Sequence, residues 1–132
     1  VEKHMVSKVK IGKNILVAED DDANFLFIRE VLAGKDYFIV RATNGREVIE
    51  TVKERQDIDL VLMDIKMPDL DGYKATKYIK EIRNDLPVIA QTAYAFTSDR
   101  EKALAAGCDD YISKPIDSAK LLALIAKYLK QE

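Results

Sequence analysis

Five short apolar runs, each followed by a helical pattern, impose the strongest constraint on how this chain can fold. Apolar residues recur at helical spacing after each run, as Phe25, Ile28 and Leu32 do after the first one. The connections are only a few residues long, which requires parallel strands joined by right-handed crossovers. The sequence therefore predicts an α/β three-layer sandwich, in which five helices cover both faces of a five-stranded parallel sheet. The predicted strands are residues 14–18, 37–42, 59–64, 87–93 and 110–113.

Length and composition fit one globular domain. The chain has 132 residues, of which 48% are hydrophobic and 33% are charged. A net charge of −2 with both signs mixed argues against a nucleic-acid surface spread over the domain, and no apolar run is long enough to span a membrane. A single cysteine excludes an internal disulfide and favours a reducing compartment, so we expect a cytoplasmic location. Residues 1–13 are predicted to be a tail, and 14–130 the domain.

Polar residues follow four of the five predicted strands. Glu19 and Asp20 come after the first strand, Asp64 ends the third, Thr92 lies at the end of the fourth, and Lys114 follows the fifth. In parallel sheets the working site lies beyond the carboxyl ends of the strands, near the point where the strand order reverses. We therefore expect three carboxylates, a hydroxyl and an ammonium to meet at one edge of the sheet.

Three carboxylates in one place would repel each other unless a divalent cation lies between them. Oxygen ligands without cysteine or histidine fit Mg²⁺, or Mn²⁺ as the alternative ion, better than zinc. With the metal in place, the Asp64 carboxylate could attack a phosphoryl group and form an acyl phosphate. Lys114 and the Thr92 hydroxyl are suited to stabilise the charge on that group.

Each residue also has an ordinary structural interpretation. Glu19 to Asp22 could be the acidic first turn of a helix, where the helix dipole favours negative charge. Asp64 could form a turn, Thr92 could be a strand residue, and Lys114 could be a surface lysine. Their occurrence together, each just past a different strand, favours the functional interpretation.

The motifs resemble the receiver domain of two-component response regulators, over nearly all of 13–129. "ILVAEDD" is similar to the acidic pocket of that family, and "LVLMDIKMPDLDG" is similar to its most diagnostic segment. The resemblance implies a flavodoxin-like fold with strand order 2-1-3-4-5. It also implies that Glu19, Asp20, Asp64 and the backbone carbonyl of Lys66 bind the metal, and that Asp64 is the phosphoacceptor.

"IAQTA" and "DDYISKP" carry the rest of the resemblance. They imply that Thr92 and Tyr111 form the conformational switch and that Lys114 binds the phosphoryl group. They also imply that the peptide bond between Lys114 and Pro115 is cis, which places the ammonium over the site. By the same resemblance, Lys66 and Tyr94 tune the lifetime of the acyl phosphate, and the bulky Tyr94 ring predicts slow self-hydrolysis.

The resemblance implies a switch in a phosphorelay that accepts a phosphoryl group from a phosphohistidine. The expected partners are a sensor histidine kinase, a histidine phosphotransfer domain, or both, with no direct nucleic-acid or membrane contact. The face made by the fourth helix, fifth strand and fifth helix is a candidate dimerisation surface. The domain would catalyse its own phosphorylation and dephosphorylation. The segment "EKALAAGCDDYISKPI" is most similar to receivers fused to sensor kinases, which predicts a hybrid kinase, with the receiver on the cytoplasmic side of the membrane.

Two other functions would use a similar fold. A Mg²⁺-dependent phosphohydrolase also forms an aspartyl phosphate, but such enzymes carry a second aspartate two residues later, where this chain has Lys66. A flavodoxin-like cofactor binder needs a glycine- and hydroxyl-rich phosphate loop after the first strand, and the acidic run there would repel phosphate.

Overall fold

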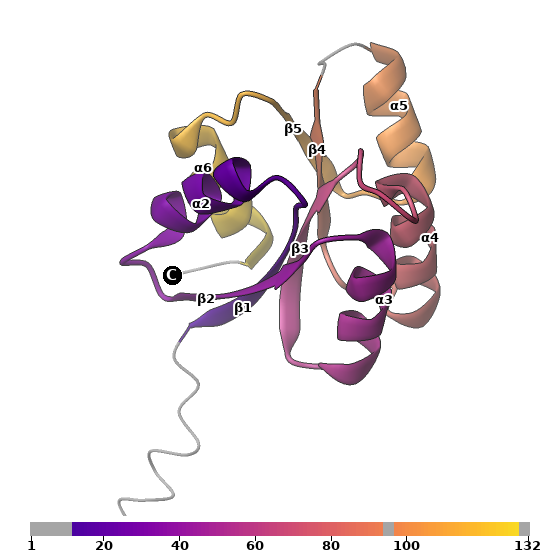
Figure 1. Ribbon diagram of the computed structural model, residues 1–132, viewed down its shortest axis with the longest axis horizontal. Helices are drawn as coiled ribbons and strands as arrows, with labels where there is room; N and C mark the ends of the chain where they lie inside the picture. The colour runs from indigo at the N-terminus through magenta and orange to yellow at the C-terminus, as the bar shows by residue number, and fades with distance from the viewer. Residues whose placement is uncertain (1–11, 94–96, 130–132) are drawn as a thin grey trace, which may run out of the picture.

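Strands and helices alternate along the chain in the computed structural model, which describes residues 12–93 and 97–129. The strands of this part of the chain are β1 (Lys13–Ala18), β2 (Tyr37–Ala42), β3 (Ile58–Asp64), β4 (Val88–Thr92) and β5 (Asp110–Ser113). The helices are α2 (Asp22–Leu32), α3 (Gly45–Glu54), α4 (Gly72–Ile82), α5 (Thr97–Ala106) and α6 (Ser118–Leu129). Figure 1 shows α2 and α6 on one face of the sheet, and α3, α4 and α5 on the other. The three-layer sandwich is confirmed.

The sheet has the order β2-β1-β3-β4-β5, and every neighbouring pair is parallel. This is the strand order that the sequence predicted. The order reverses between β1 and β3, because the chain leaves β1 toward β2 and then crosses back to β3. Glu19 and Asp64 therefore flank the reversal point, where ligands bind in open α/β sheets.

Apolar side chains on both faces hold the central strands in place. Ile15 and Val17 pack under α2 and α6, whereas Leu16 and Ala18 pack under α3, α4 and α5. All four residues are fully buried, because helices cover both sheet faces. The site at the end of these strands is thus supported by a rigid core.

The first strand begins one residue earlier than predicted. Lys13 pairs with Tyr37, and its backbone N–H donates to the Asp36 carbonyl at 2.9 Å. Lys13 therefore belongs to the domain and not to the predicted tail. The apolar pattern missed it because a charged side chain at a strand end leaves no hydrophobic signal.

The helices have well-defined starts. The Asn44 side chain accepts a hydrogen bond from the Glu47 backbone, Asp71 accepts one from Lys74, and Asp117 accepts one from Ala119. The longest helix of the described residues is α6, with 12 residues. Among these helices, none combines the length and the apolar content that crossing a bilayer would require.

The loop after β3 returns closely over the end of that strand. Gly72 N–H donates to the Ile65 carbonyl at 3.0 Å, and a Cβ added to Gly72 would lie 2.6 Å from the Asp64 carbonyl oxygen. Only glycine fits at this close approach. Met67, which belongs to this loop, packs into the core.

Candidate functional site

Three carboxylates converge at the carboxyl ends of β1 and β3. Glu19, Asp20 and Asp64 each place one carboxylate oxygen within 4.8 Å of the other two. Glu19 is fully buried and Asp64 is 4% exposed, whereas Asp20 is open to solvent. The predicted convergence is confirmed, and its chemistry suits a hard divalent cation.

Glu19 is held at the buried side of this cluster. One of its carboxylate oxygens accepts from the Asn24 side-chain amide, and the other accepts from the Asp21 backbone N–H at 3.2 Å. Burial raises the pKa of the Glu19 carboxyl to about 7, the hydrogen bond from Asn24 opposes this rise, and the neighbouring Asp64 carboxylate adds to it. The Glu19 carboxyl is therefore harder to ionise than an exposed glutamate, and a cation bound beside it would favour its charged form.

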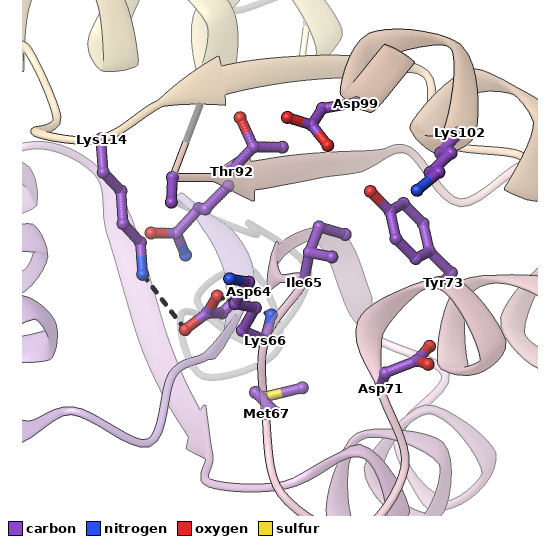
Figure 2. Close-up of a pocket in the computed structure, with 12 residues that line it drawn as sticks. Asp64, Ile65, Lys66, Met67, Asp71, Tyr73, Thr92, Asp99, Lys102 and Lys114 are labelled. Carbon is purple, nitrogen blue, oxygen red and sulfur yellow. Dashed lines mark hydrogen bonds and ion pairs between the residues drawn. The ribbon is translucent and has the colours of Figure 1, made fainter. Parts of the chain in front are cut away.

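Lys114 faces the cluster from the loop after β5. Its Nζ lies 3.2 Å from Asp64 Oδ2 and 3.7 Å from Glu19 Oε1. The Lys114–Pro115 bond is cis, as the resemblance implied, and the Lys114 N–H donates to the Thr92 carbonyl at 2.7 Å. Figure 2 shows the lysine side chain reaching toward Asp64.

Asp64 is fixed from a second side by its own loop. Its Oδ1 accepts from the Lys66 backbone N–H at 3.0 Å, so each carboxylate oxygen has one hydrogen-bond donor. A rigid carboxylate in a defined orientation is what a nucleophile requires.

A pocket of about 460 Å³ opens over Asp64 and is also lined by Thr92, Lys66 and Lys114. Thr92 ends β4 and is 5% exposed. The pocket continues between the starts of α4 and α5, where Figure 2 shows Tyr73 and Lys102. It is large enough for a phosphoryl group and part of its donor.

One predicted switch residue, Tyr111, lies apart from this pocket. Tyr111 is on β5, half-buried at the edge of the core, and the Arg100 guanidinium lies 5.9 Å from the centre of its ring. It does not line the pocket over Asp64. Tyr94 lies outside the described residues, so its predicted role stays a prediction.

Sequence reasoning missed two side chains beside the cluster. Asn24 on α2 contacts both Glu19 and Gln91. Gln91, on β4, is 1% exposed. A glutamine inside the otherwise apolar run "PVIAQTA" was an available signal, because a buried amide needs a partner.

Comparison with known proteins agrees with this site. Residues 15–126 match the family model of the response regulator receiver domain. The polar-differentiation response regulator DivK of Brucella anthropi is 37% identical over 120 residues, which are 89% of this chain and 96% of that protein.

The chain belongs to the response regulator receiver domain family. It is therefore a phosphoacceptor switch of two-component signalling, and the comparisons give no support to the phosphohydrolase alternative.

Solved receiver structures have the same flavodoxin-like fold. The receiver of the sensor histidine kinase PA1611 from Pseudomonas aeruginosa PAO1, crystallised with a magnesium ion coordinated in its active-site cleft, is 35% identical with a TM-score of 0.83. The match covers 91% of this chain and 99% of that one. Receivers bind Mg²⁺ at an acidic site, and this chain has an acidic cluster made by Glu19, Asp20 and Asp64.

A second similar structure is a complex. It contains the receiver domain of Ssk1 from Saccharomyces cerevisiae and the histidine phosphotransfer protein Ypd1. The match has 28% identity, a TM-score of 0.83, and covers 92% of this chain and 91% of that one. Receiver domains thus interact with histidine phosphotransfer proteins and with kinases.

Proposed function

We propose that Asp64 is the phosphoacceptor of this receiver, and that Glu19, Asp20, Asp64 and the backbone carbonyl of Lys66 hold Mg²⁺. The observation that carries this proposal is the position of Asp64, buried at 4% exposure within 4.8 Å of two other carboxylates and 3.2 Å from the Lys114 ammonium. The ion neutralises charge on the carboxylates and on the incoming phosphoryl oxygens when it is bound. Orientation of the reacting groups comes from the side chains.

In the reaction, one Asp64 carboxylate oxygen attacks the phosphorus of a phosphohistidine. A P–O bond forms, the P–N bond breaks, and the imidazole nitrogen keeps the electron pair of that bond and takes up a proton. Lys114, which pairs with Asp64 in the resting protein, turns to a phosphoryl oxygen. The Thr92 hydroxyl donates to a second phosphoryl oxygen from the end of β4. Hydrolysis of the acyl phosphate by water in the same site resets the domain.

The conformational change after phosphorylation begins at Thr92. When its hydroxyl moves toward the phosphoryl group, the space that it leaves is filled by the inward-turned ring of Tyr111. Tyr111 is on β5 and its ring lies beside Arg100 of α5, so its rotation changes the surface of α5 and β5. The α5–β5–α6 face is our proposed dimerisation surface in the phosphorylated state.

A small phosphodonor tests the assignment of Asp64. Incubation with acetyl phosphate and Mg²⁺ should add one phosphoryl group by intact-protein mass spectrometry, and Asp64→Asn should abolish the addition. Asp99→Asn is the matched control, because Asp99 is a carboxylate that lines the same pocket outside the cluster. Equal labelling of Asp64→Asn and the wild type would refute the assignment. Repeating the reaction with Mn²⁺ tests the alternative ion.

We further propose that the partner is a histidine kinase or a histidine phosphotransfer protein on the cytoplasmic side, and that the parent protein is a hybrid kinase. The PA1611 and Ssk1 relatives support this partner class. Transfer of labelled phosphate from a phosphorylated histidine phosphotransfer protein to Asp64 is the test. Slow loss of that label would agree with shielding by Tyr94 and tuning by Lys66, whereas a half-life of seconds would contradict it.

A further inference from the structure

Two side-chain amides, the half-buried Asn24 and the buried Gln91, link the acidic cluster to the sheet. Asn24, on the first turn of α2, donates from Nδ2 to Glu19 Oε1 and to Gln91 Oε1, the latter at 3.2 Å. Gln91 stands on β4 beside Asp64, its register partner on β3. The chain of contacts from Gln91 through Asn24 thus ends on a carboxylate of the cluster.

The side chain of Gln91 is energetically unfavourable at its position. Its Nε2 is buried and has no hydrogen-bond partner among the described residues. An unpaired buried donor destabilises a fold, and an apolar side chain of similar volume would avoid that cost. The flanking strand residues Val88, Ile89 and Ala90 are all apolar and fully buried. Stability alone therefore does not account for a glutamine at this position.

Glu19 is the ligand whose orientation most needs support. Its side chain has one more rotatable bond than an aspartate, so its carboxylate can take more orientations. Besides the Asp21 N–H on its other oxygen, the Asn24 amide is the neutral donor that fixes it. Asn24 is itself fixed by Gln91, since both contacts use the same Nδ2.

We propose that Gln91 and Asn24 are positioning residues for the metal site: Gln91 holds the Asn24 amide, and Asn24 holds the Glu19 carboxylate where it converges with Asp20 and Asp64. This inference rests on the proposed function, because it assumes that the cluster binds Mg²⁺. Outer partners that orient ligands in this way commonly change metal affinity when they are removed.

Gln91→Leu separates positioning from stability. The variant keeps a similar volume and removes both the acceptor for Asn24 and the unpaired donor. The thermal unfolding temperature in EDTA should stay the same or rise, while the Mg²⁺ dissociation constant should increase roughly 10-fold. The chain has no tryptophan, so calorimetry or amide NMR is the suitable measurement. An unchanged dissociation constant would overturn the proposal, as would a weaker affinity that merely follows a loss of stability.

Asn24→Ala is the second variant, for the case that Gln91→Leu does not fold. Alanine favours the helix at this half-buried position, and the loss of Mg²⁺ affinity should be at least as large as that of Gln91→Leu, because the contact with Glu19 itself is removed. Thr76→Val is the control. Thr76 is a fully buried hydroxyl on α4 that donates to the Gly72 carbonyl, and its loss should leave the Mg²⁺ dissociation constant unchanged. Equal weakening by Thr76→Val would overturn the specific role of the amide pair.

A double-mutant cycle tests the route through Glu19. The shorter side chain of Glu19→Asp should not reach Asn24, so adding Gln91→Leu to it should change the dissociation constant by less than about twofold. If Gln91→Leu weakened Mg²⁺ binding equally in the wild type and in Glu19→Asp, Gln91 would not act through Glu19. Failure of the proposed function looks different, because the wild type and Asp64→Asn would then bind Mg²⁺ equally well or not at all.

Discussion

Charged side chains have opposite charges and backbone groups as partners at the amino ends of β4 and β5, whereas like charges face each other at the carboxyl ends of β1 and β3. Asp109, just before β5, accepts from Lys80 Nζ and from the Val88 N–H, each at 2.8 Å. At the other end, Glu19 and Asp64 lie together in the interior with Lys114 as the nearby cation. The first arrangement stabilises the fold. The second brings like charges together, and a bound cation would relieve their repulsion.

This difference predicts opposite effects of removing a carboxylate. Asp109→Ala should lower the free energy of unfolding by about 2 kcal/mol, because it leaves the Val88 N–H without its acceptor and removes the carboxylate that pairs with Lys80. The Lys80 ammonium keeps its hydrogen bonds to the Leu86 and Asn84 carbonyls. Urea denaturation measures this effect. Asp85→Ala, at an exposed position, is the control and should be near neutral. An unchanged free energy of unfolding for Asp109→Ala would show that these contacts do not stabilise the amino ends of β4 and β5.

At the carboxyl ends, Asp64→Asn should raise the free energy of unfolding in EDTA by about 1 kcal/mol, because it removes a buried carboxylate that faces Glu19. Asp71→Asn is the control. Asp71 lines the same pocket but is the N-cap residue of α4, a position where asparagine and aspartate cap equally well, so this substitution should leave the free energy of unfolding nearly unchanged. A destabilised Asp64→Asn would show that the pair with Lys114 outweighs the repulsion.

A further prediction concerns the pH dependence of stability. The pKa of Glu19 is raised from 4.5 to about 7 in the folded protein, so the fold binds this proton more tightly than the unfolded chain does. Its contribution to stability is fully present below pH 4.5 and is lost as the pH rises through about 7. Glu19→Gln should remove this part of the pH dependence in EDTA. Parallel profiles for the two proteins between these values would contradict the shift.

The sequence predicted the strands, their parallel pairing and the meeting of Glu19, Asp64, Thr92 and Lys114, because parallel strands bring their carboxyl ends to one edge. It did not predict the contact between Asn24 and Gln91, which are 67 residues apart and meet only in the folded protein, where the start of α2 approaches the end of β4. The partners of Asp109 were missed for the same reason, since Lys80 is 29 residues away on α4. Local patterns predict elements and their ends, whereas pairings between side chains depend on packing.

A crystal structure grown with Mg²⁺ and beryllofluoride, a phosphoryl mimic, tests the central claim most directly. The account predicts one ion among the carboxylates of Glu19, Asp20 and Asp64, with the beryllofluoride on Asp64. The Lys114 ammonium and the Thr92 hydroxyl should both contact the fluorides. An adduct on another residue, or an acidic cluster that stays without an ion at saturating Mg²⁺, would contradict it.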